Sequence, residues 1–447
     1  MNARALLSVP VLLGVLVVGC GDSSSEEGPG FELTAEDRGS SPPVPPPSGS
    51  PVPPPMPPAP PRPAPPLAPL RVPIPDTLRE SGAKVLVTRL HLARPSQEFM
   101  TQVPPGTQEF EIQGTPGEIL AVSVLRPDGE LVDAVMVKAE DAHRVSRKPR
   151  ARFLRVPAEY ATIQAAVDAA SAGDAVVVAP GRYTGTVRLK SDIRLFGSGS
   201  AWTVLDGGGA PVQLIDFSGA TNVVVAGFTF QNVGRGKVCD HDTSMTLCSG
   251  NWYSAAIFAD GHFEQGQAPT SALLTHNIFH GNPVGVLLYY YARAVVRNNV
   301  FVANTHGLVA NYFNGESLVA NNVFWNNSHH AIVSHAADLD VLDNVVAGSQ
   351  VGVFHAYGNQ QGRVRCNVLF QNGVYLQERF LVPPWFELGQ HGNVEAEPRF
   401  MLPERGHFHP LEDSPLVDAG CFGEALPDPD GTPQDVGAHG GPLGAWQ

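Results

Sequence analysis

The chain has few basic residues for its length. Among its 447 residues there are 29 Lys and Arg against 43 Asp and Glu, which gives a formal net charge of −14. One short basic cluster lies at residues 144–155, and no motif of a nucleic-acid-binding module accompanies it. A nucleic-acid binder needs a basic face that neutralises phosphates. The composition therefore predicts no nucleic-acid partner, and the basic cluster is expected to be a solvated linker.

Long apolar runs are also scarce, and the one at the N-terminus is too short to cross a membrane. Residues 5–18 are apolar and follow a basic residue, which is the pattern of a signal peptide over residues 1–19. Residues 17–20 read Val-Val-Gly-Cys and resemble the lipobox of bacterial lipoproteins. This resemblance implies that Cys20 carries lipid, including palmitate, and anchors an exported protein in the cell envelope. By the same resemblance, Gly21 implies delivery to the outer membrane.

Cysteine is rare, with five residues in the whole chain. Once Cys20 is set aside, an even number remains, which permits disulfides in an exported protein and leaves three pairings open. The short polar spacing favours a local Cys239–Cys248 bridge, and Cys366–Cys421 then follows by elimination. No CxxC spacing occurs, so the cysteines predict no zinc site.

Proline is concentrated between residues 40 and 75. Such a segment favours polyproline II and cannot pack a core, so residues 20–75 are predicted to form a disordered tether. Residues 76–147 contain short strand-like runs separated by Pro-Gly and Pro-Asp-Gly turns. These runs predict a small β-sandwich-like module of immunoglobulin type, in which nothing suggests chemistry.

Asparagine recurs along the second half of the chain at intervals of 22 or 23 residues. A coil of this length cannot bury its own apolar face, so successive coils must stack like rungs, about 4.8 Å apart. The short apolar runs in each coil predict strands, and the Asn amides are expected to bond one another from rung to rung. The sequence therefore predicts an all-β fold, a right-handed parallel β-helix over residues 150–447. The repeating positions are Asn277, Asn299, Asn322, Asn344 and Asn367.

The start of this region carries a helical pattern. Residues 162–170 place Ile163, Ala166, Val167 and Ala170 on one face, which predicts an amphipathic helix that caps the open end of the first coil. Residues 160–207 resemble the opening of the pectate-lyase-like β-helix superfamily, with a Tyr-x-Thr-Ile-Gln helix followed by a Gly-Asp-x-Val-x-Val-x-Pro-Gly-x-Tyr strand. The tail from residue 413 resembles the closing segment of the same superfamily.

The resemblance implies a fold and no single activity, since this fold carries many functions. The Asn-Thr-Asp, Asp-Asp and Gly-His-Gly segments of polygalacturonase-like members are absent, as is the Asp-Pro-His motif of mannuronan epimerases. The Arg-x-Pro-x-x-Arg segment of calcium-dependent pectate lyases occurs only at residues 147–152, in the basic linker, where it is interpreted as a coincidence.

Two further sets of residues, one mainly aromatic and one mainly charged, recur at fixed offsets from the ladder asparagines. They flank the same turn on successive coils. Stacked aromatic rings beside charged groups form a platform for a sugar chain, and the alternative is a structural stack beside a solvated turn. A base near a C5 proton and a cation facing a carboxylate would suffice for a lyase, for which His335, Arg293, Tyr312 and Glu316 are the catalytic candidates. The predicted substrate-binding residues are Tyr290, Tyr312, His335, Tyr357 and Asp338.

Histidines form a second group. His306 and His329 have the same offset from the ladder, which predicts that they are rung neighbours, and a structural role is expected because spacing alone does not define a metal site. Residues 428–435 superficially resemble a calcium loop but lack its alternating oxygen ligands, so they are expected to close the final coil. The sequence predicts no metal site and no cofactor, with Ca²⁺ left open.

Together these patterns predict a monomeric bacterial lipoprotein, anchored to a membrane through its lipid. Its β-helix is expected to bind or organise polysaccharide, without assignable catalysis. Two alternatives stay open: a polysaccharide lyase or uronate epimerase, and a structural surface spacer or adhesin.

Overall fold

A computed structural model describes most of the chain from residue 67 onward. The described residues are 67–91, 94–144, 152–210, 212–235, 254–263, 266–267, 270–311, 316–335, 337, 339–356, 363–379 and 388–446. The predicted signal peptide, Cys20, most of the tether, the Cys239–Cys248 pair, Tyr312, Asp338 and Tyr357 lie outside them. Among the described residues, no helix has the length and apolar character needed to cross a membrane.

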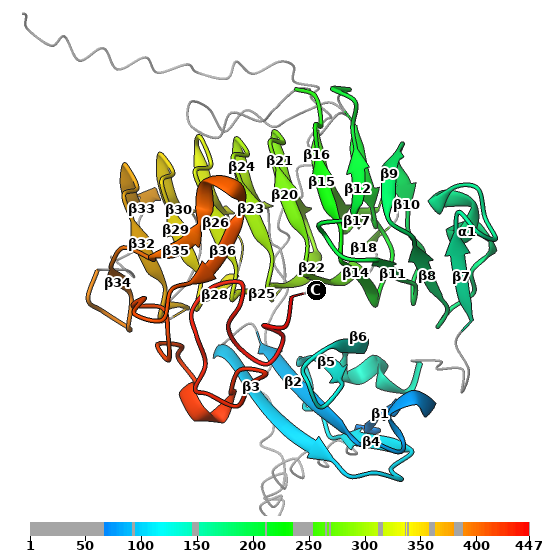
Figure 1. Cartoon of the computed structure of the whole chain (residues 1–447). Helices are drawn as coiled ribbons and strands as arrows, with labels where there is room; N and C mark the ends of the chain where they lie inside the picture. Colours follow the sequence, from blue (N-terminus) through cyan, green and yellow to red (C-terminus); the bar gives the residue numbers. More distant parts are fainter. Residues whose placement is uncertain are drawn as a thin grey trace, which may run out of the picture. The chain divides into compact units, whose positions relative to one another are not determined.

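The main body is a right-handed parallel β-helix built from three parallel sheets, as the sequence predicted (Figure 1). The first sheet has nine strands: β7 (Phe153–Val156), β8 (Ala175–Val178), β11 (Arg194–Gly197), β14 (Val223–Ala226), β19 (Thr270–Thr275), β22 (Ala292–Arg297), β25 (Ser317–Ala320), β28 (Leu339–Leu342) and β31 (Val364–Arg365). The second also has nine: β9 (Gly181–Thr184), β12 (Thr203–Asp206), β15 (Thr229–Gln231), β20 (Ile278–His280), β23 (Val300–Val302), β26 (Val323–Trp325), β29 (Val345–Ala347), β32 (Val368–Phe370) and β34 (Val394–Glu395). The third has eight: β10 (Val187–Arg188), β13 (Gln213–Asp216), β16 (Ala255–Asp260), β21 (Val284–Tyr289), β24 (His306–Asn311), β27 (His330–His335), β30 (Val351–Ala356) and β33 (Val374–Arg379).

The predicted asparagine ladder is confirmed. Each side-chain amide donates a hydrogen bond to the amide oxygen of the next rung, over 2.9 to 3.2 Å. The ladder continues one rung beyond the predicted members to Asn393, after an interval that no longer fits the repeat. Beside it, the rings of Phe279, Phe301 and Phe324 stack with centroids 4.6 and 4.5 Å apart. The coils are therefore held in register by buried amides and by stacked apolar rings.

The predicted cap is also present. Helix α1 (Ile163–Ala169) packs against the first coil, and its buried side chains are Ile163, Ala166 and Val167. The helix begins at Thr162, whose Oγ1 accepts a hydrogen bond from the Ala165 backbone N–H at 3.1 Å. The helix thus covers apolar side chains at the end of the stack.

The small β module consists of a four-stranded antiparallel sheet and a two-stranded ladder. The sheet has the order β3-β2-β5-β6, formed by β2 (Ala83–His91), β3 (Arg94–Val103), β5 (Ile119–Leu125) and β6 (Leu131–Lys138). The ladder pairs β1 (Leu70–Pro73) with β4 (Glu109–Ile112), and the 3-10 helices η1 (Asp76–Leu78) and η2 (Ala139–Arg144) connect to these strands. The predicted tether boundary at residue 75 is wrong, because Leu70 and Val72 are buried in the core of the module.

The module packs on the outer face of the first sheet, which the sequence did not predict. Apolar residues of β5 and β6 join those of the β-helix in one cluster. The contact contains a buried ion pair between Arg297 and Glu98, whose side chains are 1% and 0% exposed and approach to 2.8 Å. Arg194 pairs with Asp133 in the same contact. The module therefore covers the part of the first sheet that carries these residues.

The C-terminal segment covers part of the second sheet. Its elements are β35 (Phe400–Leu402), η3 (Pro403–Arg405), β36 (His407–Pro410) and η4 (Gly423–Ala425). Elsewhere in the chain, β17 (His262–Phe263) and β18 (Gly266–Gln267) form a short hairpin. Phe400, Phe408 and Leu416 pack against the outward valines of the second sheet. A disulfide between Cys366 and Cys421 ties this segment to the β-helix.

Candidate functional site

The register of the third sheet changes the predicted aromatic column. Tyr289, Asn311 and His335 lie opposite one another on successive rungs, and Tyr290 lies one residue further along the chain. The predicted column of Tyr290 with His335 is therefore wrong by one residue. The cause is one extra residue in a bend: β24 begins seven residues after its ladder asparagine, and β27 begins eight residues after its own.

The charged residues of the neighbouring turn contact one another. Arg293 Nε lies 3.2 Å from Glu316 Oε2, and the two side chains are only 14% and 6% exposed. His335 shares a hydrogen bond of 2.8 Å with Asn311 Oδ1, and burial lowers the pKa of His335. The two charges of the ion pair thus neutralise each other, which weakens the case for Arg293 and Glu316 as catalytic groups. Of the other predicted members of this site, Tyr290 follows β21 and is half-buried, whereas Tyr312, Asp338 and Tyr357 lie outside the described part of the chain.

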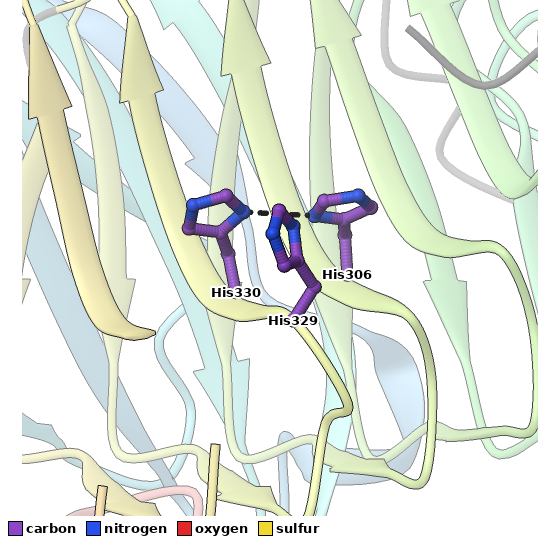
Figure 2. Close-up of side chains that lie close together, drawn as sticks. All are labelled: His306, His329 and His330. Carbon is purple, nitrogen blue, oxygen red and sulfur yellow. Dashed lines mark hydrogen bonds between the residues drawn. The ribbon is translucent and has the colours of Figure 1, made fainter. Parts of the chain in front are cut away.

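Three histidines converge on the third sheet, and we call His306, His329 and His330 the histidine cluster. His306 Nδ1 and His330 Nδ1 are 3.2 Å apart, and their rings stack with centroids 5.2 Å apart at 15°. The His329 ring lies edge-on to both, at 5.1 Å from His306 and 4.1 Å from His330. In the view of Figure 2, the His329 ring is drawn in front of the hydrogen bond that joins the other two rings. One nitrogen from each ring lies within 4.8 Å of the others.

The extra residue in the bend explains why these side chains meet. His306 pairs in register with His330, so the predicted rung pairing of His306 with His329 is wrong. His329 precedes the strand, where its N–H donates to Thr305 O at 3.0 Å and its carbonyl accepts from Val351 N at 2.8 Å. An inserted residue re-aims the side chains next to it. The signal was present in the sequence as a one-residue change of offset, and a fixed repeat concealed it.

The donor set of the histidine cluster is nitrogen only. Imidazole suits zinc, copper and nickel ions, whereas calcium and magnesium prefer oxygen ligands. His306 and His330 are 3% and 1% exposed, and His329 is half-buried. The cluster therefore fits a borderline transition-metal ion and does not fit Ca²⁺.

Residues 428–435, which superficially resemble a calcium loop, form a turn in which the carboxylates accept hydrogen bonds from the chain itself. The Asp428 carboxylate accepts hydrogen bonds from the backbone N–H groups of Asp435 and Gly441. Burial, together with the Asp435 charge, raises the pKa of Asp428 to about 8. Asp430 accepts a hydrogen bond from Thr432 Oγ1 at 2.7 Å. These carboxylates thus organise the end of the chain.

A second buried acid lies beside the disulfide. Asp343 Oδ1 accepts a hydrogen bond of 2.8 Å from the Cys421 N–H. Burial raises the pKa of Asp343 to about 7. The hydrogen bond helps to position the C-terminal segment against the β-helix.

A cleft of about 310 Å³ lies where the module meets the ends of the first-sheet strands. We call it the phenylalanine cleft, because Phe153 and Phe196 lie on its wall and Phe153 is 55% exposed. Sequence reasoning missed it, since its walls come from segments that are far apart in the chain. Polar groups on its lining include Thr77, Arg126, Glu130 and Ser200.

The strand order of the three sheets defines the chain as a right-handed parallel β-helix protein. Residues 211–379 match the model of a family described as periplasmic copper-binding protein (NosD). This match covers less than half of the chain. No curated protein matches the sequence.

Three solved structures with similar folds have low sequence identity to this chain. A family 28 exopolygalacturonase from Yersinia enterocolitica is 14% identical, with 61% of this chain and 62% of that chain covered and a TM-score of 0.37. A GH87 α-1,3-glucanase from Streptomyces thermodiastaticus strain HF3-3 is 15% identical, with coverages of 68% and 60% and a TM-score of 0.37. The mannuronan C-5 epimerase AlgE6 A-module from Azotobacter vinelandii is 14% identical, with coverages of 53% and 94% and a TM-score of 0.27. The chain thus spans about 60% of the length of the first two.

Proposed function

We propose that this protein binds polysaccharide at the bacterial cell envelope, as an exported lipoprotein anchored through Cys20. The observation that carries the proposal is the phenylalanine cleft between the module and the β-helix. Clefts between separately packed parts of a chain are preferred sites for ligands, and a volume of about 310 Å³ lies at the lower end of the usual range of about 300–1,000 Å³.

The lining of the cleft suits a sugar unit. The Phe153 and Phe196 rings offer apolar faces on which the C–H face of a sugar ring can pack. Arg126 and Glu130 form an ion pair on the same lining, where both side chains are partly exposed and can hydrogen-bond to hydroxyls. Thr77 and Ser200 add polar groups. An apolar wall with a few polar groups is the usual composition of a site that binds and orients a small ligand.

Binding is favoured over lyase or epimerase chemistry. Among the described residues that the sequence offered as a base or a cation, Arg293 is paired with Glu316 and His335 is hydrogen-bonded to Asn311. A Pro-rich tether of the kind that the sequence predicts would hold a binding site away from the membrane, where envelope polysaccharide is accessible.

Replacing Phe153 by alanine should weaken polysaccharide binding about tenfold. A ring contact of this kind contributes on the order of 1 kcal/mol or slightly more, and 1.4 kcal/mol corresponds to a factor of ten. Retardation in gels that contain a panel of neutral and acidic polysaccharides measures the change.

Phe99→Ala provides the matched control, because Phe99 is an exposed aromatic residue of the module outside the cleft. Its binding should equal that of the unchanged protein. The proposal is wrong if Phe153→Ala binds as tightly as the control, or if no polysaccharide in the panel retards the protein. Unsaturated sugar ends that absorb in the ultraviolet would instead support the lyase alternative.

A further inference from the structure

We infer that the histidine cluster binds one borderline divalent transition-metal ion, of the class of Zn²⁺ or Cu²⁺, on the third sheet of the β-helix. This site is independent of the phenylalanine cleft. Its donors would be one imidazole nitrogen each from His306, His329 and His330.

The separation of the two buried histidines fits a shared ion. Zinc–nitrogen bonds of 2.0–2.1 Å in tetrahedral geometry place two ligand nitrogens about 3.3–3.4 Å apart. His306 Nδ1 and His330 Nδ1 are already 3.2 Å apart. An ion could thus replace the hydrogen bond between the two rings with little movement of either side chain.

The third ligand comes from the more accessible side. The His329 ring lies edge-on to the stacked pair, and one of its nitrogens is within 4.8 Å of theirs. Its side chain is half-buried, so it is the ligand through which solvent reaches the cluster. Three histidines leave a fourth position open to water or to another ligand, which is the arrangement of metal sites that are not purely structural.

The backbone around the cluster is rigid, and its surroundings are apolar. His306 and His330 lie at the starts of paired strands, and hydrogen bonds from both neighbouring coils fix the His329 backbone. The Phe354 ring lies 5.3 Å from His330, and Val309 and Val333 belong to the same outward apolar cluster. A rigid frame reduces the conformational entropy that ligands lose on binding, and apolar surroundings strengthen interactions with the ion.

The number of residues per coil is irregular next to the histidine cluster. Register-paired residues at the starts of third-sheet strands are Val284, His306, His330 and Val351, so their steps along the chain are 22, 24 and 21 residues. The long coil and the short coil that follows it flank His329 and His330. The shorter coil thus restores the repeat after the longer one. The local effect of the extra residue is to bring the three imidazole rings together.

The test uses the full chain, purified without an affinity tag, and titrates it with Zn²⁺ and separately with Cu²⁺ in a calorimeter. We expect one equivalent of ion per chain. His329→Ala should weaken the affinity at least about tenfold, while far-UV circular dichroism shows that the β-helix is intact. His280→Ala is the matched control, because His280 is an exposed histidine on the second sheet, and its affinity should be unchanged.

Electron paramagnetic resonance of the Cu²⁺ form gives a second readout. The spectrum should show couplings to several imidazole nitrogens, and fewer in His329→Ala. This variant keeps the buried pair, so the result does not depend on whether substitutions of His306 or His330 fold. The inference is overturned if neither ion binds at one equivalent, if His329→Ala binds as tightly as His280→Ala, or if the copper spectrum lacks nitrogen couplings.

Discussion

Replacing Glu98 by glutamine should lower the free energy of unfolding by about 3–5 kcal/mol, because it leaves the Arg297 guanidinium buried without a counter-charge. Both side chains are almost completely buried between the module and the first sheet. Arg297 Nη2 also donates to Asn321 Oδ1 at 3.2 Å, and Thr88 Oγ1 donates to Glu98, so the pair belongs to a buried network. Urea unfolding followed by circular dichroism measures the loss.

A surface ion pair in the same module provides the control. Glu111 pairs with Arg71 at 2.9 Å, but both side chains are exposed, so Glu111→Gln should cost less than about 1 kcal/mol. The double replacement Arg297→Met with Glu98→Leu removes both charges and should recover most of the lost stability. A cost below 1 kcal/mol for Glu98→Gln would show that the module does not dock on the β-helix through this pair.

Replacing Asn322 by aspartate should cost at least about 3 kcal/mol, although the two side chains have nearly the same shape. The Asn322 Nδ2 group donates to Val296 O at 2.9 Å, to Ala320 O at 3.0 Å and to Asn344 Oδ1 at 2.9 Å. A carboxylate cannot donate to any of the three, and each buried partner left without its bond costs about 1–3 kcal/mol. The same urea experiment measures this cost.

Asn326→Asp is the control for the ladder. Asn326 is exposed and has a left-handed backbone conformation, which aspartate also tolerates. Its substitution should change the free energy of unfolding by no more than about 0.5 kcal/mol. Equal effects at the two positions would mean that the buried amide ladder does not stabilise the stack.

The ladder could be predicted because it is periodic. Each Asn makes the same contacts on its own rung, so the sequence carries the pattern at a nearly constant interval. The helix at Ile163–Ala169 was predictable for a similar reason, since the apolar face and the Thr162 cap are both local. Neither prediction depends on contacts between distant segments.

The features that escaped prediction depend on register or on distant contacts. One extra residue before His330 shifts the register of β27, which places His335 opposite Asn311 and His330 opposite His306. Nothing near Glu98 in the sequence indicates a partner 199 residues away. The phenylalanine cleft escaped for the same reason, because it exists only after the module docks. The tether boundary failed because proline content concealed a short buried strand at Leu70–Pro73.

The candidate site was predicted in part. The sequence drew attention to the turn at Arg293 and Glu316, and the structure places these two side chains together on neighbouring rungs. Their mutual ion pair, which sequence could not show, makes them a structural contact. The histidines were noticed, but their convergence depends on the register shift.

A disulfide cross-link tests whether the stacked coils shift register by one residue at β27. Parallel neighbours in register have Cα atoms close enough for a disulfide. Asn311→Cys with His335→Cys should therefore form a cross-link in high yield under mild oxidation, as detected by peptide mass spectrometry. Asn311→Cys with Ser334→Cys should not, because adjacent residues of a strand point to opposite faces. A cross-link through position 334 and none through 335 would contradict the register, and with it the convergence of the histidine cluster.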